Sequence, residues 1–255
     1  MVWSFSNFKI FISFLNFGKL LDAVKKITFS LIKTLYICAM ILHDESAPKV
    51  AEFLLQIKAI KLQPTNPFTW ASGWKSPIYC DNRVSLSFPK IRTYIRQQLG
   101  KAIIEQFGKP DVIAGVATAG IPQGVLVAQD LGLPFVYVRS EAKSHGMNNQ
   151  IEGFIESGQS VVVIEDLIST GGSSLKAVRA LKAKGCEVKG MAAIFTYGFP
   201  VAEISFRDEK CQAVTLCDYE TLVSQALKLN HVSPEDLHSL REWRESPETW
   251  GKKHK

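Results

Sequence analysis

The sequence has few features of metal or thiol chemistry. Only five of its 255 residues are cysteines, and none belongs to a C-x-x-C pair or has a histidine at the spacing of a metal ligand. This pattern indicates neither a zinc site nor a redox motif. Buried structural thiols are the simpler interpretation. An odd, scattered number in a chain without a convincing export signal is typical of a reducing compartment, so we expect a cytoplasmic protein.

Long apolar runs and the common nucleotide fingerprints are missing as well. No uncharged apolar stretch reaches the roughly 18 residues that a membrane span requires. Neither the G-x-x-x-x-G-K-S/T loop nor the G-x-G-x-x-G turn occurs. A composition of 46% hydrophobic and 21% charged residues is that of an ordinary globular protein. It excludes collagen, low-complexity disorder and a disulfide scaffold.

The first 39 residues differ from the rest of the chain. They contain five Lys, one Asp and no Arg, a net charge of +4, whereas residues 40–255 account for only +2 of the total of +6. Their pattern fits neither a secretory signal nor a mitochondrial transit peptide. Met40 is the first methionine after Met1. We therefore expect that translation starts at Met40, that residues 1–39 are an extension outside the fold, and that residues 40–255 form the domain. The alternative is a weak membrane-surface anchor of Lys and Phe.

From residue 91 onward, helical and apolar segments alternate. Short apolar runs at 112–116, 134–138, 161–164 and 188–195 are separated by helical patterns at 91–107, 122–130 and 174–184. This alternation predicts an α/β fold with a mostly parallel sheet covered on both faces. Residues 150–160, with Glu-Ser-Gly at their middle, predict an inserted hairpin. Two short helices are expected in 218–243.

One strand-to-helix segment, residues 161–174 (VVVIEDLISTGGSS), indicates a specific ligand. Its glycines, its hydroxyls and the start of the following helix are suited to cradling a phosphate. The two adjacent acids, Glu165 and Asp166, would repel phosphate and therefore need sugar hydroxyls or a divalent cation as partners. A phosphorylated ribose offers a phosphate and a diol at this separation. The alternative is a plain capped turn without a ligand.

The same segment resembles the phosphoribosyl-pyrophosphate (PRPP) motif of type I phosphoribosyltransferases. The resemblance implies that the two acids hold the ribose hydroxyls and that the following loop wraps the 5-phosphate. It assigns to PRPP the residues Glu165, Asp166, Leu167, Ile168, Ser169, Thr170, Gly171, Gly172 and Ser173.

Residues 139–146 (RSEAKSHG) follow a predicted strand and bring three basic side chains into one loop. A solvated charged loop would be the default interpretation. The pattern is, however, similar to the catalytic loop of orotate phosphoribosyltransferases, which closes over the pyrophosphate. This resemblance implies that Arg139, Lys143 and His145 are catalytic and also bind PRPP.

Residues 68–79 (FTWASGWKSPIY) resemble the N-terminal F-T-x-x-S-G-x-x-S-P-x-Y segment of the same family, which forms part of its orotate pocket. The resemblance implies that Phe68, Ser72, Gly73 and Tyr79, together with Ser169, bind orotate. Residues 115–122 match the family's turn toward the pyrophosphate, although by themselves they predict an ordinary strand-to-helix connection.

The chain departs from the family's pattern at several positively charged positions. Some bacterial members carry Lys where this chain has Ala71, Ala119 and Ser140. Some also use an Arg after the next strand for the orotate carboxylate, where residues 195–198 read Phe-Thr-Tyr-Gly. The group that binds the carboxylate is therefore unassigned, with Ser169 and backbone N–H groups near Ser72 and Gly73 as the remaining candidates.

The family resemblance implies a complete set of expectations. The fold is the type I phosphoribosyltransferase fold, a mostly parallel sheet flanked by helices, with a small N-terminal hood and an inserted flexible hairpin loop. The reaction transfers the phosphoribosyl group of PRPP to orotate, with Mg²⁺ held mainly by PRPP and no direct metal ligand from the chain. A homodimer with shared active sites is implied, with neither a nucleic-acid nor a membrane partner. The alternatives are a purine phosphoribosyltransferase and a non-catalytic PRPP-sensing regulator.

Overall fold

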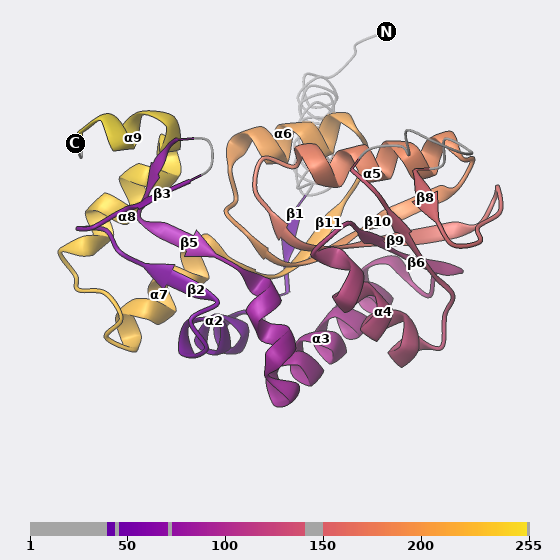
Figure 1. Ribbon diagram of the computed structural model, residues 1–255, viewed down its shortest axis with the longest axis horizontal. Coiled ribbons are helices and arrows are strands. Elements are labelled where there is room, and N and C mark those ends of the chain that lie inside the picture. The colour runs from indigo at the N-terminus through magenta and orange to yellow at the C-terminus, as the bar shows by residue number, and fades with distance from the viewer. Residues whose placement is uncertain (1–39, 44–45, 71–72, 141–149, 254–255) are drawn as a thin grey trace, which may run out of the picture. The chain divides into compact units, whose positions relative to one another are not determined.

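A seven-stranded sheet forms the centre of the computed structural model, which describes residues 40–43, 46–70, 73–140 and 150–253 (Figure 1). The strand order is β1-β11-β10-β9-β6-β7-β8, and every neighbouring pair is parallel except β7 with β8. The strands are β1 (Met40–Leu42), β6 (Val112–Val116), β7 (Phe135–Val138), β8 (Ile151–Glu152), β9 (Ser160–Ile168), β10 (Glu187–Thr196) and β11 (Ala213–Asp218).

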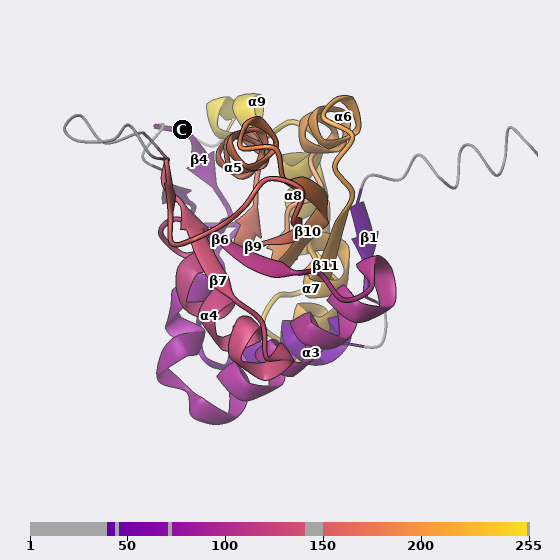
Figure 2. The ribbon, with the colours of Figure 1, turned by 90° about the vertical axis from the view of Figure 1, so that its right-hand side faces the viewer.

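Helices cover both faces of this sheet (Figure 2). One face carries α2 (Ala47–Gln56), α3 (Pro89–Phe107), α4 (Gly120–Leu131) and α7 (Tyr219–Lys228), and the other carries α5 (Gly172–Ala183) and α6 (Pro200–Asp208). Strand β9 shows why both faces are apolar. Val161 and Val163 pack toward α5, whereas Val162 and Ile164 pack toward α3 and α4, because successive side chains of a strand point to opposite faces.

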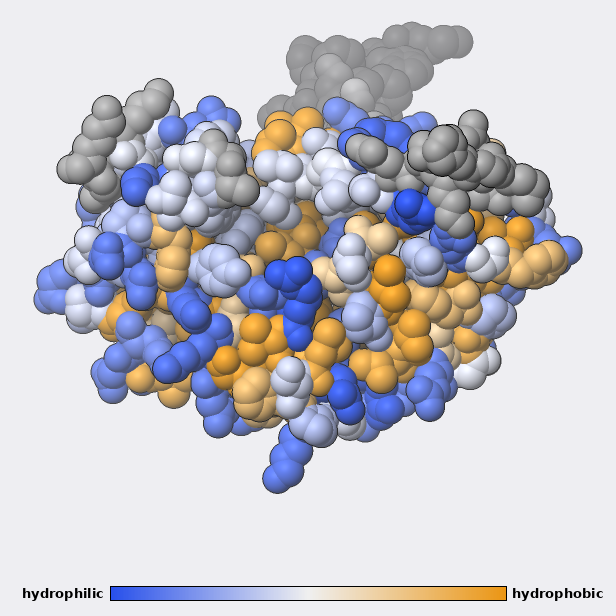
Figure 3. Space-filling model, viewed as in Figure 1, coloured by the Kyte–Doolittle hydropathy of each residue, from blue (hydrophilic) through white to orange (hydrophobic). Residues whose placement is uncertain are grey.

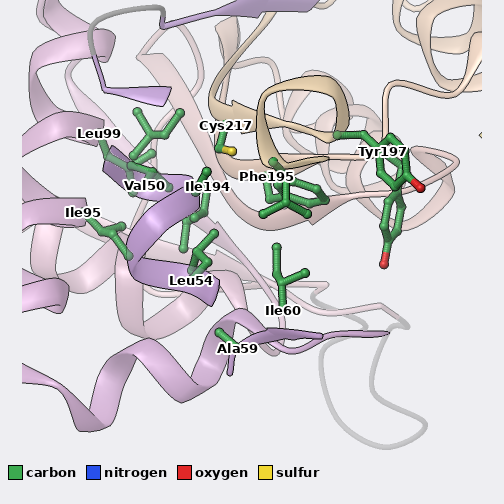
Figure 4. Packing of buried hydrophobic residues seen from close by; sticks show 14 of the residues in the cluster. Val50, Leu54, Ala59, Ile60, Ile95, Leu99, Ile194, Phe195, Tyr197 and Cys217 are labelled. Atoms are coloured by element: carbon green, nitrogen blue, oxygen red, sulfur yellow. The ribbon is translucent and has the colours of Figure 1, made fainter. Parts of the chain in front are cut away.

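The larger core lies on the face covered by α2 and α3. Figure 4 shows Val50 and Leu54 of α2 facing Ile95 and Leu99 of α3, with Ile194 of β10 between them. All five side chains are fully buried. Burying an aliphatic side chain of this size contributes about 1.5–3 kcal/mol, so this layer is a main source of stability.

A small hood stands at the carboxyl end of the parallel strands. It consists of residues 60–80, in which β2 (Ile60–Leu62) pairs with β5 (Ile78–Cys80) and β3 (Phe68–Thr69) pairs with β4 (Lys75–Ser76). The 3₁₀ helix η1 (Asn82–Ser87) connects it to α3. Helices α8 (Asp236–Glu245) and α9 (Pro247–Lys253) lie beside the hood, and α9 packs against β4 (Figure 1).

The predicted α/β class, with a mostly parallel sheet between two layers of helices, is confirmed. The predicted hairpin in 150–160 is wrong, because β8 pairs with β7 while β9 pairs with β6 and β10. The acids Glu165 and Asp166 lie within β9, not after it, since the strand continues to Ile168. Within the tail, α7 and α8 are the two expected helices, and α9 follows them.

Residues Ala39–Lys255 form one compact unit. The prediction for residues 1–39 falls outside the described residues. Among the residues that the structure does describe, no helix is long and apolar enough to cross a membrane.

Candidate active site

The carboxyl ends of the parallel strands meet at one edge of the sheet, and the segments predicted to bind PRPP lie along it. Arg139 follows β7, the turn 117–119 follows β6, and the acids and the glycine loop end β9. Ligands of open α/β sheets bind at this edge. The sheet order therefore brings together three segments that are separated in the chain.

Glu165 is held in place by hydrogen bonds and by burial. Its Oε2 accepts from the hydroxyl of Ser174 at 2.9 Å, and its Oε1 accepts from the amide of Asp166 at 3.1 Å. Burial raises the pKa of the Glu165 carboxyl well above its usual value, and the charge of Asp166 raises it further. Burial also raises the pKa of Asp166. The raised pKa values mean that the two carboxyls bind protons more readily than ordinary acids. Their oxygens can accept hydrogen bonds from the neutral hydroxyls of a sugar.

The loop from Ser169 to Gly171 leaves its donors available. Within the described chain, the hydroxyls of Ser169, Thr170 and Ser173 form no hydrogen bond. Helix α5 begins with no side-chain cap and no acid in its first turn. No side-chain acceptor therefore occupies the first N–H groups of the helix, and no acid neutralises the positive end of its dipole. Both features suit the binding of an anion such as phosphate.

Gly171 is required by the shape of this loop. Its φ is +82°, in the left-handed region, and an added Cβ would lie 2.8 Å from the ring of Phe206. Any other residue would be strained at this φ and would also have to displace a buried aromatic side chain.

Replacing Gly171 with Ala is expected to destabilise the protein by about 1–3 kcal/mol and to weaken PRPP binding, because the loop must move away from Phe206. Thermal unfolding and equilibrium PRPP binding measure the two effects. Gly172→Ala is the matched control, since an added Cβ there meets only the Thr170 hydroxyl oxygen at 4.0 Å. Equal effects of both substitutions would contradict this role of Gly171.

The turn after β6 lies directly against the acids. An added Cβ on Gly120, the first residue of α4, would run into the carbonyl oxygen of Ile164 and lie 3.4 Å from the Cα of Glu165. Only glycine allows the helix to come this close to β9. Residues 117–119, predicted to face the pyrophosphate, are thereby placed beside the acids that are predicted to hold the ribose.

The hood is tied to the same strand end. The Nδ2 of Asn82 donates to the backbone oxygen of Asp166 at 2.7 Å, and Asn82 is fully buried. The guanidinium of Arg83 forms a two-pronged ion pair with Asp81, at 2.7 and 3.0 Å. The charge of Arg83 opposes the rise in the pKa of Asp166, so it lies near that acid. The residues that follow the hood therefore lie against the end of β9 that carries the two acids.

Of the residues predicted to bind orotate, Phe68 and Tyr79 come together, with their ring centroids 5.6 Å apart. Gly73 occupies the turn between β3 and β4 with φ +85°. Ser72 lies outside the described residues. Tyr79 is 40% exposed, so its ring is open to a ligand.

Of the residues predicted to be catalytic, only Arg139 is described. It is anchored on both sides, because its backbone N–H donates to Gln150 and its backbone oxygen accepts from the side chain of that residue. Its guanidinium forms an ion pair with Glu152 at 3.4 Å. Lys143 and His145 fall outside the described residues.

Four residues of the site region were not predicted from the sequence: Asn82, Ser174, Tyr197 and Arg244. Asn82 bonds a strand 84 residues away, and the guanidinium of Arg244 bonds the carbonyls of Tyr197 and Gly198. No local pattern marks such pairs. Three of them nevertheless lie in or near segments that the sequence singled out: Ser174 ends the 161–174 segment, Tyr197 belongs to 195–198, and Asn82 follows the 68–79 motif by three residues.

A family model described as the phosphoribosyl transferase domain matches residues 89–221. This range contains β6, the acids, the glycine loop and α5. The fold, the site and this match together define the chain as a phosphoribosyltransferase.

Similarity to whole proteins shows which kind of phosphoribosyltransferase the chain resembles. The chain is 59% identical to the orotate phosphoribosyltransferase of Bacteroides fragilis over 200 residues, which are 78% of this chain and 94% of that one. It is 57% identical over 204 residues to that of Listeria innocua, covering 80% of this chain and 98% of the relative. The crystal structure of the Aeropyrum pernix orotate phosphoribosyltransferase matches with a TM-score of 0.63 and 27% identity, covering 72% of this chain and 99% of that one. The chain belongs to the orotate phosphoribosyltransferase family.

Proposed function

We propose that this protein transfers the 5-phosphoribosyl group from PRPP to N1 of orotate, giving orotidine 5'-monophosphate and pyrophosphate in the de novo synthesis of UMP. The observation that carries the proposal is the identity of 57–59% to orotate phosphoribosyltransferases over nearly their whole length. The hood supports it, because it places the aromatic pair Phe68 and Tyr79 on the same side of the sheet edge as the acids.

The PRPP molecule lies along the sheet edge in this proposal. Glu165 and Asp166 accept hydrogen bonds from the ribose hydroxyls, and residues 167–173 wrap the 5-phosphate with backbone N–H groups and hydroxyls. The unused first turn of α5 supports the phosphate position. Contacts to both the ribose hydroxyls and the 5-phosphate orient C1 of the ribose toward the base. Holding the two reacting groups in this orientation raises the rate of the reaction.

Cleavage of the bond from C1 to pyrophosphate leaves positive charge on the ribose ring and negative charge on the leaving group. Lys143, Arg139 and His145 neutralise the leaving group in this proposal, and loop closure excludes water. Mg²⁺ would add positive charge to the same oxygens. Oxygen ligands suit Mg²⁺, and PRPP supplies them. Among the described residues no cluster of three His, Cys, Asp or Glu is arranged to hold a metal. In this proposal Mg²⁺ is held mainly by PRPP.

Turnover on orotate, adenine and hypoxanthine, each with PRPP and Mg²⁺, tests the function. We expect product only from orotate. Turnover of either purine in place of orotate would support the alternative of a purine phosphoribosyltransferase. PRPP binding without turnover of any base would support the alternative of a PRPP-sensing regulator.

We also propose that the protein acts in the cytoplasm as a homodimer, with no nucleic-acid or membrane partner. An apolar surface over η1, α3 and α4 supports the dimer (Figure 3). On it, Phe88 and Val125 are 41% and 43% exposed. Apolar side chains gathered on one face are typical of a protein interface. The exposed or half-buried apolar residues of η1, of the residue after it and of α4 include Val84, Leu86, Phe88, Ile121, Val125 and Leu126.

A shared active site can be tested with mixed dimers. A heterodimer of one Lys143→Ala and one Glu165→Gln subunit, purified with two different tags, is expected to show about half of the wild-type activity, because the loop of one subunit completes the site of the other. Each homodimeric variant serves as the control. A heterodimer as inactive as both controls would contradict the shared site.

A further inference from the structure

Tyr197 lies where the hood, β9 and β10 meet. It directly follows β10, and its backbone N–H donates to the carbonyl oxygen of Ile168 at 3.2 Å, one residue before Ser169. On the other side, its ring lies 5.7 Å from the ring of Trp70 in the hood. The residue therefore stands between the phosphate loop and the hood, the two parts of the site that a base must bridge.

The side chain of Tyr197 is enclosed by aromatic rings. The centroids of Phe195, Phe199 and Trp243 lie 5.3–5.5 Å away, and only 2% of the residue is exposed. Figure 4 shows it at the end of the core cluster remote from Val50 and Leu99. Burial raises the pKa of its hydroxyl well above the usual value, and nearby Cys80 and Asp166 raise it further. The phenol is therefore a neutral hydrogen-bond donor at neutral pH.

The Tyr197 hydroxyl forms no hydrogen bond with any residue in the described ranges. Tyr219, whose ring belongs to the same cluster, differs, because its hydroxyl donates to the carbonyl oxygen of Leu240 at 3.0 Å. The hydroxyl of a tyrosine that is only 2% exposed is normally paired. An unpaired one at a ligand site is typical of a donor that is reserved for the ligand.

Arg244 fixes the backbone that carries Tyr197. Its Nε donates to the carbonyl of Tyr197 and its Nη2 to that of Gly198, both at 3.2 Å. Its Nη1 pairs with Glu220 at 3.3 Å. All three nitrogens of the guanidinium thus have partners in the protein, and two of them fix the backbone of Tyr197 and Gly198 after β10.

From this arrangement we infer that the Tyr197 hydroxyl donates a hydrogen bond to the carboxylate of bound orotate and selects for an anionic pyrimidine. The inference rests on the proposed function. It assigns a donor to the carboxylate in a chain that has no arginine in residues 195–198. A neutral donor within an aromatic enclosure strengthens this bond, because hydrogen bonds to charged groups gain in a medium of low dielectric constant.

The test compares Tyr197→Phe with Tyr219→Phe. We expect Tyr197→Phe to weaken equilibrium binding of orotate about 10- to 100-fold, the usual effect of losing a hydrogen bond to a charged group. Binding of neutral pyrimidines that carry no acceptor at C6, such as uracil, is expected to change less than about 2-fold. The melting temperature of Tyr197→Phe is expected to stay at the wild-type value, because no bond to the described chain is lost.

Tyr219→Phe is expected to do the reverse, lowering the melting temperature and leaving the orotate affinity unchanged, because it removes a structural hydrogen bond. Equal losses for orotate and for the neutral pyrimidines in Tyr197→Phe would overturn the inference, since they would assign the hydroxyl to pocket shape alone. Unchanged orotate binding in Tyr197→Phe would overturn it as well. The wild-type protein is measured in parallel, and its failure to bind or turn over orotate would refute the proposed function instead.

Discussion

Replacing Lys143 with alanine is expected to lower kcat for orotate by about 10²–10³-fold, because a positive charge over the departing pyrophosphate stabilises the transition state far more than the ground state. Losses of this size correspond to removing one well-placed donor from a charge-stabilising site. Little change is expected in the free energy of unfolding, because the loop sequence contributes no predicted core residue. Steady-state kinetics with orotate and thermal unfolding measure the two quantities.

Lys109→Ala is the matched control for this experiment. Lys109 is exposed and precedes β6, so it lies at the edge of the sheet opposite to the site. Its removal changes the net charge by the same amount and is expected to leave kcat unchanged. Near wild-type turnover of Lys143→Ala would refute the catalytic role of this lysine.

Glu165→Gln is expected to change activity and stability in opposite directions. Loss of the ionised acceptor should lower kcat/KM for PRPP about 10- to 100-fold, the effect of losing one charged hydrogen bond. In the free protein the same change removes a buried carboxylate. Since the Gln side chain can still pair with the Ser174 hydroxyl and the Asp166 amide, the free energy of unfolding near neutral pH should rise.

The pH dependence of this gain follows from the raised pKa of Glu165. A carboxyl whose folded pKa exceeds its unfolded value contributes stability that is fully present below the unfolded pKa and is lost as pH rises through the folded pKa. The stability advantage of Glu165→Gln should therefore be largest at neutral pH and shrink as the pH falls and wild-type Glu165 becomes protonated. Over the same range, wild-type kcat/KM for PRPP should fall.

Denaturant unfolding from pH 4 to 8 and PRPP kinetics measure these two trends. Glu187→Gln is the control, because Glu187 is exposed at the amino end of β10. A stability difference for Glu165→Gln that does not vary with pH would show that the carboxylate carries no burial cost.

The parts of the fold with a strong local pattern were predictable. The run 112–116 is β6 to the residue, because a continuous apolar stretch between turn residues suits a strand buried on both faces. The helix predicted from residue 91 begins at Pro89, a residue favoured in the first turn of a helix. The glycine loop was predictable for the same reason, since its glycines, hydroxyls and acids are adjacent in the chain.

Strand pairing was less predictable than strand position. Strand β8 has only two residues, too few to show an alternation of apolar and polar side chains. Its antiparallel pairing with β7 therefore could not be predicted from its own sequence. Similarly, the predicted apolar run ended at residue 164, before the two acids, because charged residues rarely continue a buried strand. The Asp166 amide and the Ser174 hydroxyl satisfy Glu165 there, and Ser174 reaches it because α5 packs against β9.

The sequence alone indicated the chemistry of this protein through three segments, each complete within a few residues. The phosphate loop with its two acids is typical of type I phosphoribosyltransferases, and the basic loop and the aromatic segment are typical of orotate phosphoribosyltransferases. The tertiary structure decided how the acids, the glycine loop and the hood are brought together. The bond from Asn82 to Asp166, the aromatic enclosure of Tyr197 and the hold of Arg244 on its backbone all join residues far apart in the chain. Such contacts depend on the sheet order and on the packing of the hood, α8 and α9, and no local pattern specifies them because they arise only when the chain is folded.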